Sequence, residues 1–160
     1  MQLSGQTRFQ LIDEDGDDLP GQWEFAWEGR DPFEVVIAAV TEVSGRPWKW
    51  SVRHTHSGRL SPQRCRILST RVGNVLRKEN RKRLCDCITR VIAEEFVGHR
   101  RRKMDTESVM SVLATVDPEA PEDLEVPPEV TTAIMLRKFR QALKAAVECD
   151  GGLKVNWQIE

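Results

Sequence analysis

The chain has 160 residues, of which 39% are apolar and 31% charged, with a formal net charge of −1. This length suits a single domain with a sizeable core, and the composition excludes a fibrous or intrinsically disordered protein. No apolar run approaches the roughly 20 residues of a membrane-spanning helix. The first ten residues lack the basic and apolar regions of a secretory signal, so we expect a cytoplasmic protein with reduced cysteines.

The first predicted element is a β-hairpin over residues 7–28. Apolar side chains occupy every second position in residues 7–11 and again in residues 23–27, which is typical of strands with one buried face. Between them lies an acidic loop, residues 13–18, and Pro20 and Gly21 are expected to belong to the same turn. The loop has the composition of a calcium site but its glycine is in the wrong place, so we favour a plain turn.

A helix follows, with clear signals at both ends. Asp31 is expected to be the N-cap, Pro32 the first helical residue and Glu34 the third, as in a capping box. Gly45 is expected to end the helix in a left-handed conformation.

Two further strands are predicted, over residues 47–57 and 153–159. Ser57-Gly58 is expected to end the first, and Gly151-Gly152 is expected to stop a helix before the second. All five tryptophans then lie on the apolar side of a strand. The sequence therefore predicts an α+β fold, in which a small antiparallel sheet of about four strands has its Trp-rich face covered by four to five helices. An open aromatic face that stacks bases, as in RNA-binding sheets, is the alternative.

Two amphipathic helices are predicted in the middle of the chain. Ser61 is expected to cap the first, whose apolar stripe ends at Leu76, and a new stripe begins at Leu84. We therefore expect a break near Glu79-Asn80, with Asn80 capping the second helix. That cap would place Arg81, Lys82 and Arg83 in the first turn, where cations oppose the helix dipole.

The last third of the chain is expected to contain a short helix, a linker and a long helix. The short helix covers residues 106–116. The segment 117–128 has four prolines and five acids, which predicts an extended acidic linker within the single domain 1–160. The long helix spans about residues 128–148, and Arg137, Arg140 and Lys144 form a basic row opposite its apolar face.

The charges are unevenly distributed along the chain. Residues 46–103 carry 17 Lys and Arg against four acids, whereas residues 1–45 and 104–160 are both acidic. Clustered cations on helices are typical of proteins that bind phosphate backbones. We therefore predict a nucleic-acid-binding protein, DNA slightly favoured over RNA, whose contacts are Arg64, Arg71, Arg77, Lys78, Arg81, Lys82, Arg83, Arg100, Arg101, Arg102 and Lys103.

Two other interpretations of this basic region remain open at the level of sequence. It can dock an acidic partner in a protein–protein module such as an inhibitor or adaptor, or it can be a solvated face that pairs with the acidic flanks of the same chain. The oligomeric state is also open, and a two-fold homodimer would double the basic surface.

Metal binding and catalysis have little support. Zinc prefers the ligand types offered by the pairs His54/His56 and Cys85/Cys87. However, helical positions two apart point about 200° away from each other, so we expect buried thiols and no metal. Glycine-rich phosphate loops and hydrolase motifs are absent, and acid pairs such as Glu94-Glu95 are unspecific, so we expect no cofactor and a non-enzymatic role.

Overall fold

The computed structural model describes residues 4–28, 31–45, 57–95, 104–115 and 127–159. Its strands are β1 (Ser4–Ile12), β2 (Asp18–Glu28), β3 (Ser57–Leu60) and β4 (Gly152–Ile159). Its helices are α1 (Pro32–Ser44), α2 (Pro62–Val75), α3 (Arg81–Glu95), α4 (Thr106–Thr115) and α5 (Pro128–Glu148), with one 3-10 turn at Lys78–Asn80. The described part thus has the predicted α+β architecture, with a four-stranded antiparallel sheet and helices.

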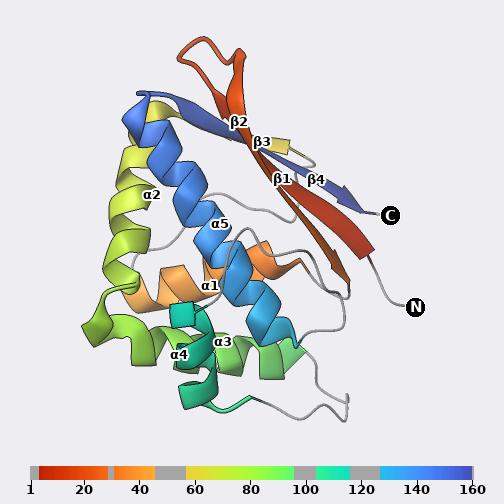
Figure 1. Ribbon diagram of the computed structural model, residues 1–160, viewed down its shortest axis with the longest axis vertical. Helices are drawn as coiled ribbons and strands as arrows, with labels where there is room; N and C mark the ends of the chain where they lie inside the picture. The colour runs from red at the N-terminus through yellow and green to blue at the C-terminus, as the bar shows by residue number, and fades with distance from the viewer. Residues whose placement is uncertain (1–3, 29–30, 46–56, 96–103, 116–126, 160) are drawn as a thin grey trace.

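The sheet has the strand order β2-β1-β4-β3, and the helices lie on one of its faces (Figure 1). The long helix α5 packs against β1, β2 and β4. At the centre of this contact, the rings of Phe9, Phe33 and Phe139 have centroids 5.0 to 5.3 Å apart. Trp27 and Trp157 are buried on the same face. The aromatic face is therefore covered in the described part of the sheet, which rules out the open base-stacking face at these residues.

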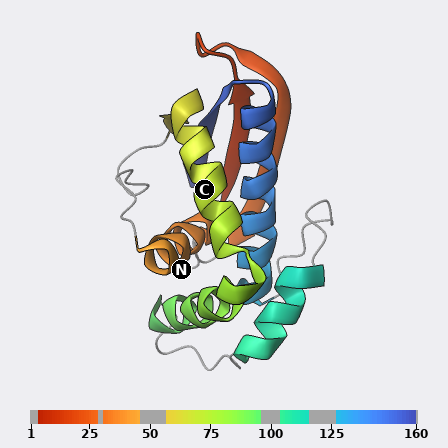
Figure 2. The ribbon, with the colours of Figure 1, turned by 90° about the vertical axis from the view of Figure 1, so that its left-hand side faces the viewer.

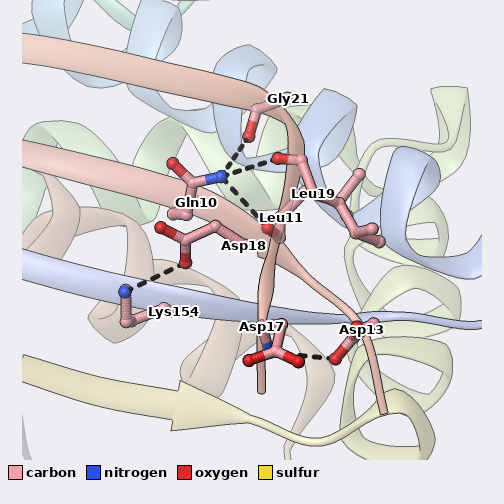
Figure 3. A network of polar contacts seen from close by, with 8 residues as sticks. All are labelled: Gln10, Leu11, Asp13, Asp17, Asp18, Leu19, Gly21 and Lys154. Atoms are coloured by element: carbon pink, nitrogen blue, oxygen red, sulfur yellow. Dashed lines mark hydrogen bonds and ion pairs between the residues drawn. The ribbon is translucent and has the colours of Figure 1, made fainter. Parts of the chain in front are cut away.

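The hairpin β1–β2 is longer than predicted at its turn. Pro20 and Gly21 belong to β2, which begins at Asp18, and a bulge between Gln10 and Ile12 absorbs the change in register. The Nε2 atom of Gln10 lies within hydrogen-bond distance of three carbonyl oxygens at this bulge, those of Leu11, Leu19 and Gly21 (Figure 3). The sequence places a loop here because proline and glycine usually end a strand, whereas a bulge accommodates both.

The acidic turn of the hairpin is stabilised by its own first residue. The carboxylate of Asp13 accepts hydrogen bonds from the backbone N–H groups of Asp15 and Asp17, each at 2.9 Å. This is an Asx-type turn, in which a side chain replaces a backbone acceptor. The prediction of a turn at these residues is confirmed.

Asp31 connects the start of α1 to the sheet. Its Oδ1 accepts from the backbone N–H of Phe33 at 2.9 Å, as an N-cap does, and from the hydroxyl of Thr7 in β1 at 3.1 Å. The Thr7 hydroxyl in turn accepts from the indole N–H of Trp27 in β2, also at 3.1 Å. The predicted cap is confirmed, and it is also part of a buried polar chain. At the other end of α1, Gly45 has the expected left-handed φ of 68°.

β3 begins where the sequence predicts a strand to end. Ser57 and Gly58 pair with Asn156 and Val155 of β4, so this dipeptide belongs to the strand and does not break it. A glycine is tolerated because β3 forms the edge of the described sheet. The remainder of the predicted strand, residues 47–56 with Trp48 and Trp50, lies outside the described residues.

The residue with left-handed backbone conformation at the end of α5 is not one of the two glycines that the sequence indicates. Asp150, and not a glycine, has the left-handed φ of 53°. The N–H groups of Asp150 and Gly151 donate to the carbonyls of Val147 and Ala146, which is the Schellman arrangement. The helix therefore ends just before the predicted stop: Asp150 takes the left-handed conformation, Gly151 contributes its N–H to the motif, and Gly152 begins β4.

Replacing Asp150 by glycine is expected to stabilise the protein by about 0.5–1 kcal/mol, because an L side chain is strained in the left-handed region. The variant loses only a 4.0 Å ion pair with Arg66, in which both side chains are more than half exposed, and such pairs contribute little. Thermal unfolding should show a melting temperature raised by about 2–3 °C. An unchanged or lower melting temperature would show that the carboxylate matters more than the backbone.

α5 also makes a polar contact with the outer strand of the sheet. The Nζ atom of Lys138 donates to the carbonyl oxygen of Glu24 in β2 at 2.9 Å and lies 5.5 Å from the centre of the Phe25 ring. Lys138 therefore fixes the position of α5 over β2.

The helix pair α2 and α3 has the predicted boundaries. Ser61 caps α2 through its hydroxyl, the predicted stripe from Cys65 to Leu76 is buried, and the break falls at Lys78–Asn80. Asn80 does not take the predicted role of capping α3, since its side-chain amide donates to the carbonyl of Asn74 near the end of α2. The predicted linker lies outside the described residues up to position 126. No described helix has the length and apolar character needed to cross a bilayer.

Candidate nucleic-acid interface

The largest group of predicted contact residues lies at the corner between α2 and α3. This basic corner comprises residues 77–83, in which five of seven side chains are cationic and Glu79 is the single acid. Arg77, Lys78, Lys82 and Arg83 are exposed there. None of these four forms an ion pair with a carboxylate in the part of the chain that the structure describes. The corner is therefore a compact surface of positive charge, open to a ligand.

The dipoles of the two helices affect these cations in opposite ways. Arg77 and Lys78 directly follow Leu76, the C-cap of α2, where a cation is favoured. Lys82 and Arg83 lie in the first turn of α3, where a cation is disfavoured. Helix stability therefore accounts for the first two cations and not for Lys82 or Arg83, which is consistent with a role in binding.

Arg81 has a structural task that the sequence does not reveal. Its Nε donates to the carbonyl oxygen of Leu76 at 2.9 Å, so the side chain caps a free carbonyl at the C-terminal end of α2. The side chain is half-buried. The bond explains how a cation is accommodated at the start of α3. It also fixes the guanidinium, so that only its remaining N–H groups can face a ligand.

The other predicted contacts are spread over different places. Arg64 is near the start of α2 and Arg71 is in its middle, both half-buried. At 1.5 Å per residue, Arg64 and Arg77 are separated by about 20 Å along the helix axis. Residues 100–103, with Arg100, Arg101, Arg102 and Lys103, lie outside the described residues. Of the predicted set, the structure thus brings together the five residues between Arg77 and Arg83.

Two cations outside the predicted set, Arg137 and Arg140, lie on α5, which packs against α3 and α4. Arg137 in α5 is half-buried, and its Nε and Nη2 donate to the carbonyl oxygen of Leu113 in α4 at 3.1 and 2.7 Å. Burial lowers the pKa of Arg137, and the positive charges of Arg140 and Arg81 lower it further. The sequence places Arg137 and Arg140 in one basic row but cannot show that Arg137 bonds to the backbone of α4.

The opposite side of α3 is less positive. Arg90 pairs with Glu42 of α1, and its Nη2 is also 3.6 Å from the sulfur of Cys87. Hydrogen bonds from Cys87 and Arg90 lower the pKa of Glu42, with a smaller contribution from the charge of Arg83. Glu42 therefore neutralises part of this side, including part of the charge of Arg83, as the interpretation of pairing within the chain requires, while Arg77, Lys78 and Lys82 have no ion pair in the described part of the chain.

The thiols of Cys85 and Cys87 are both buried on α3, as predicted. Burial raises the pKa of Cys85 to about 11 and that of Cys87 to about 12, so both are protonated at neutral pH. Among the described residues, no three His, Cys, Asp or Glu side chains are grouped as metal ligands. His54 and His56 lie outside those residues.

The basic corner and the arginines of α5 are thus the main candidate site. Their chemistry is that of cationic donors, which bind anions electrostatically and through hydrogen bonds. Comparison with protein-family models, with curated proteins and with solved structures gave no match for this chain.

Proposed function

We propose that this protein binds nucleic acid without catalysing a reaction, using the basic corner to contact backbone phosphates. The observation that supports this most directly is the exposure of Arg77, Lys78 and Lys82 on one corner, away from any paired carboxylate. A polyanion that is bound there releases its counterions, which supplies most of the affinity in non-specific binding.

The geometry favours duplex DNA over a single strand. Single-stranded nucleic acid is usually held by aromatic side chains that stack on bases, and the aromatic residues of the described sheet face are covered by helices. A convex helical corner instead fits contacts to the phosphates that line a groove. Such contacts position the protein on the duplex without reading its sequence, so we expect weak sequence preference.

The test is a titration of labelled oligonucleotides with the wild type and with the triple variant Arg77→Gln/Lys78→Gln/Lys82→Gln. Arg81 is left unchanged because its side chain closes α2. Removing three phosphate contacts is expected to weaken duplex binding about 30-fold or more at 0.1 M salt, and to reduce the slope of log K against log salt by about 2.7. Circular dichroism should show an unchanged fold.

The matched control is Arg8→Gln/Arg59→Gln/Lys154→Gln, which removes the same net charge from the sheet. It should bind DNA within about twofold of the wild type, because it breaks two surface ion pairs on the sheet, Arg8–Glu24 and Lys154–Asp18, but leaves the cations of the corner in place. Equal losses in both triple variants would mean that net charge, and not this site, controls binding. Failure of the wild type to bind any duplex or single strand would favour an acidic protein as the partner instead.

A further inference from the structure

The outward side of α2 carries side chains that the phosphate contacts of the basic corner do not use. The exposed residues of α2 are Gln63, Arg66, Ile67, Thr70 and Asn74. At about 100° per residue, these five lie within an arc of about 100° around the helix axis, opposite its buried residues. Figure 2 views α2 from outside, and no other described helix or strand lies in front of it. We refer to these five residues as the outer face of α2.

The charge along α2 is entirely positive. The segment from Ser61 to Lys78 contains no Asp or Glu. Arg64 lies in the first turn of the helix, where a cation opposes the helix dipole, so helix stability does not account for it. Arg66 forms a 4.0 Å ion pair with Asp150 in which both side chains are more than half exposed, and such a pair is easily exchanged for another anion. The helix therefore suits a polyanionic partner along its whole length.

The outer face combines the side chains that read base edges in a major groove. There, Gln and Asn pair with adenine, Arg pairs with guanine, and apolar groups contact the methyl group of thymine. Ile67 is 41% exposed and is the single exposed large hydrophobic residue in the described part of the chain. One exposed apolar residue is common on a protein surface. Here, however, it lies on one helix face with Gln63 and Asn74, so that the methyl contact and the amide contacts point the same way.

The length of α2 also fits the groove. Its 14 residues span about 21 Å, whereas the major groove of B-DNA is about 12 Å wide. A helix that crosses the groove places Arg64, near its start, and Arg77, just after its end, at the phosphates on the two sides. Ile67, Thr70 and Asn74 then lie between the two backbones, where uncharged side chains can approach the base pairs.

We propose that α2 lies in the major groove of duplex DNA and that its outer face, centred on Ile67, contacts the base edges and favours thymine. This inference rests on the proposed function and extends it to the element that enters the groove. The basic corner directly follows α2 and contacts phosphates at the edge of the groove. Because phosphate contacts leave the base sequence unread, the weak sequence preference expected for this protein comes from α2.

The test compares two duplexes of the same sequence, one with thymine and the other with uracil in every A·T pair. Uracil lacks only the methyl group in the major groove, so the phosphates and the base pairing are the same. The wild type should bind the thymine duplex about 3- to 5-fold more tightly, as expected for the burial of about one methyl group. Ile67→Ala should bind both duplexes equally, and its salt slope should be that of the wild type because no charge is lost.

Ile37→Ala in α1 is the matched control, since it makes the same change at a half-buried position of another helix. This variant should keep the preference for thymine. The corner variant Arg77→Gln/Lys78→Gln/Lys82→Gln should bind both duplexes more weakly and keep the same preference, which separates the two surfaces.

The outcomes distinguish this inference from the proposed function. If the wild type binds both duplexes equally, or if Ile67→Ala keeps the preference for thymine, α2 does not contact the bases, and the corner alone remains as the site. If the wild type binds neither duplex, the proposed function itself is wrong.

Discussion

The variant Gly152→Ala is expected to be less stable than the wild type by about 3 kcal/mol, at the upper end of the cost of overpacking. A methyl group at this position would lie 2.3 Å from the carbonyl oxygen of Leu60 in β3. The oxygen is part of the backbone of the neighbouring strand, so it cannot rotate away as a side chain would. The expected measurement is a large fall in the denaturant midpoint, followed by circular dichroism.

Gly73→Ala in α2 is the matched control for this change. Apart from the backbone of its own helix and its chain neighbours, no atom lies within 4 Å of a methyl group built there, and alanine is the better helix former, so this variant should gain about 0.5–1 kcal/mol. The same chemical change should therefore have opposite signs at the two positions. Equal denaturant midpoints for Gly152→Ala and the wild type would mean that β3 and β4 adjust at little cost.

Substitutions of Asp31 are expected to change both the stability and its dependence on pH. Burial raises the pKa of Asp31 from 3.8 to about 6, and the bonds from Phe33 and Thr7 only partly offset this effect. The folded state therefore binds the proton more tightly than the unfolded state between about pH 4 and pH 6. The stability from this group is complete below pH 3.8 and declines by about 3 kcal/mol as the pH rises through 6.

Asp31→Asn should remove this decline, because the amide oxygen still accepts both hydrogen bonds but does not titrate. Asp31→Ala should also lose the decline, but it should be about 2 kcal/mol less stable than the asparagine variant, having neither the cap nor a partner for Thr7. Urea unfolding at several pH values measures both effects. A wild-type stability that rises between pH 4 and pH 6 relative to that of Asp31→Asn would contradict the raised pKa.

The elements of this fold were predictable from the sequence where the signals were local. The alternation in β1 and β2, the caps at Asp31 and Ser61, and the span of α5 all depend on residues within a few positions of each other. Gly152 shows why other features were not. In the sequence, Gly152 indicates the end of a helix. In the structure, a glycine is needed there because the backbone carbonyl of Leu60, 92 residues earlier in the chain, leaves no room for a side chain.

The candidate site was predictable to a similar extent. The run of cations at residues 77–83 is visible in the sequence, and the amphipathic stripes on either side place it at an exposed corner. Arg81 and Arg137 were harder to interpret, because each is bonded to a carbonyl oxygen that only the folded chain brings near. Which cations belong to a binding surface and which support a helix end depends on such contacts.

The contact between Lys138 and β2 has a consequence for self-association. β2 is one of the two outer strands of the described sheet, and an outer strand offers its carbonyl and N–H groups to strands of other molecules. The ammonium group of Lys138 already occupies the carbonyl of Glu24 near the middle of that strand. An incoming strand must displace a charged side chain before it can add to the sheet there, which protects the molecule against edge-to-edge aggregation.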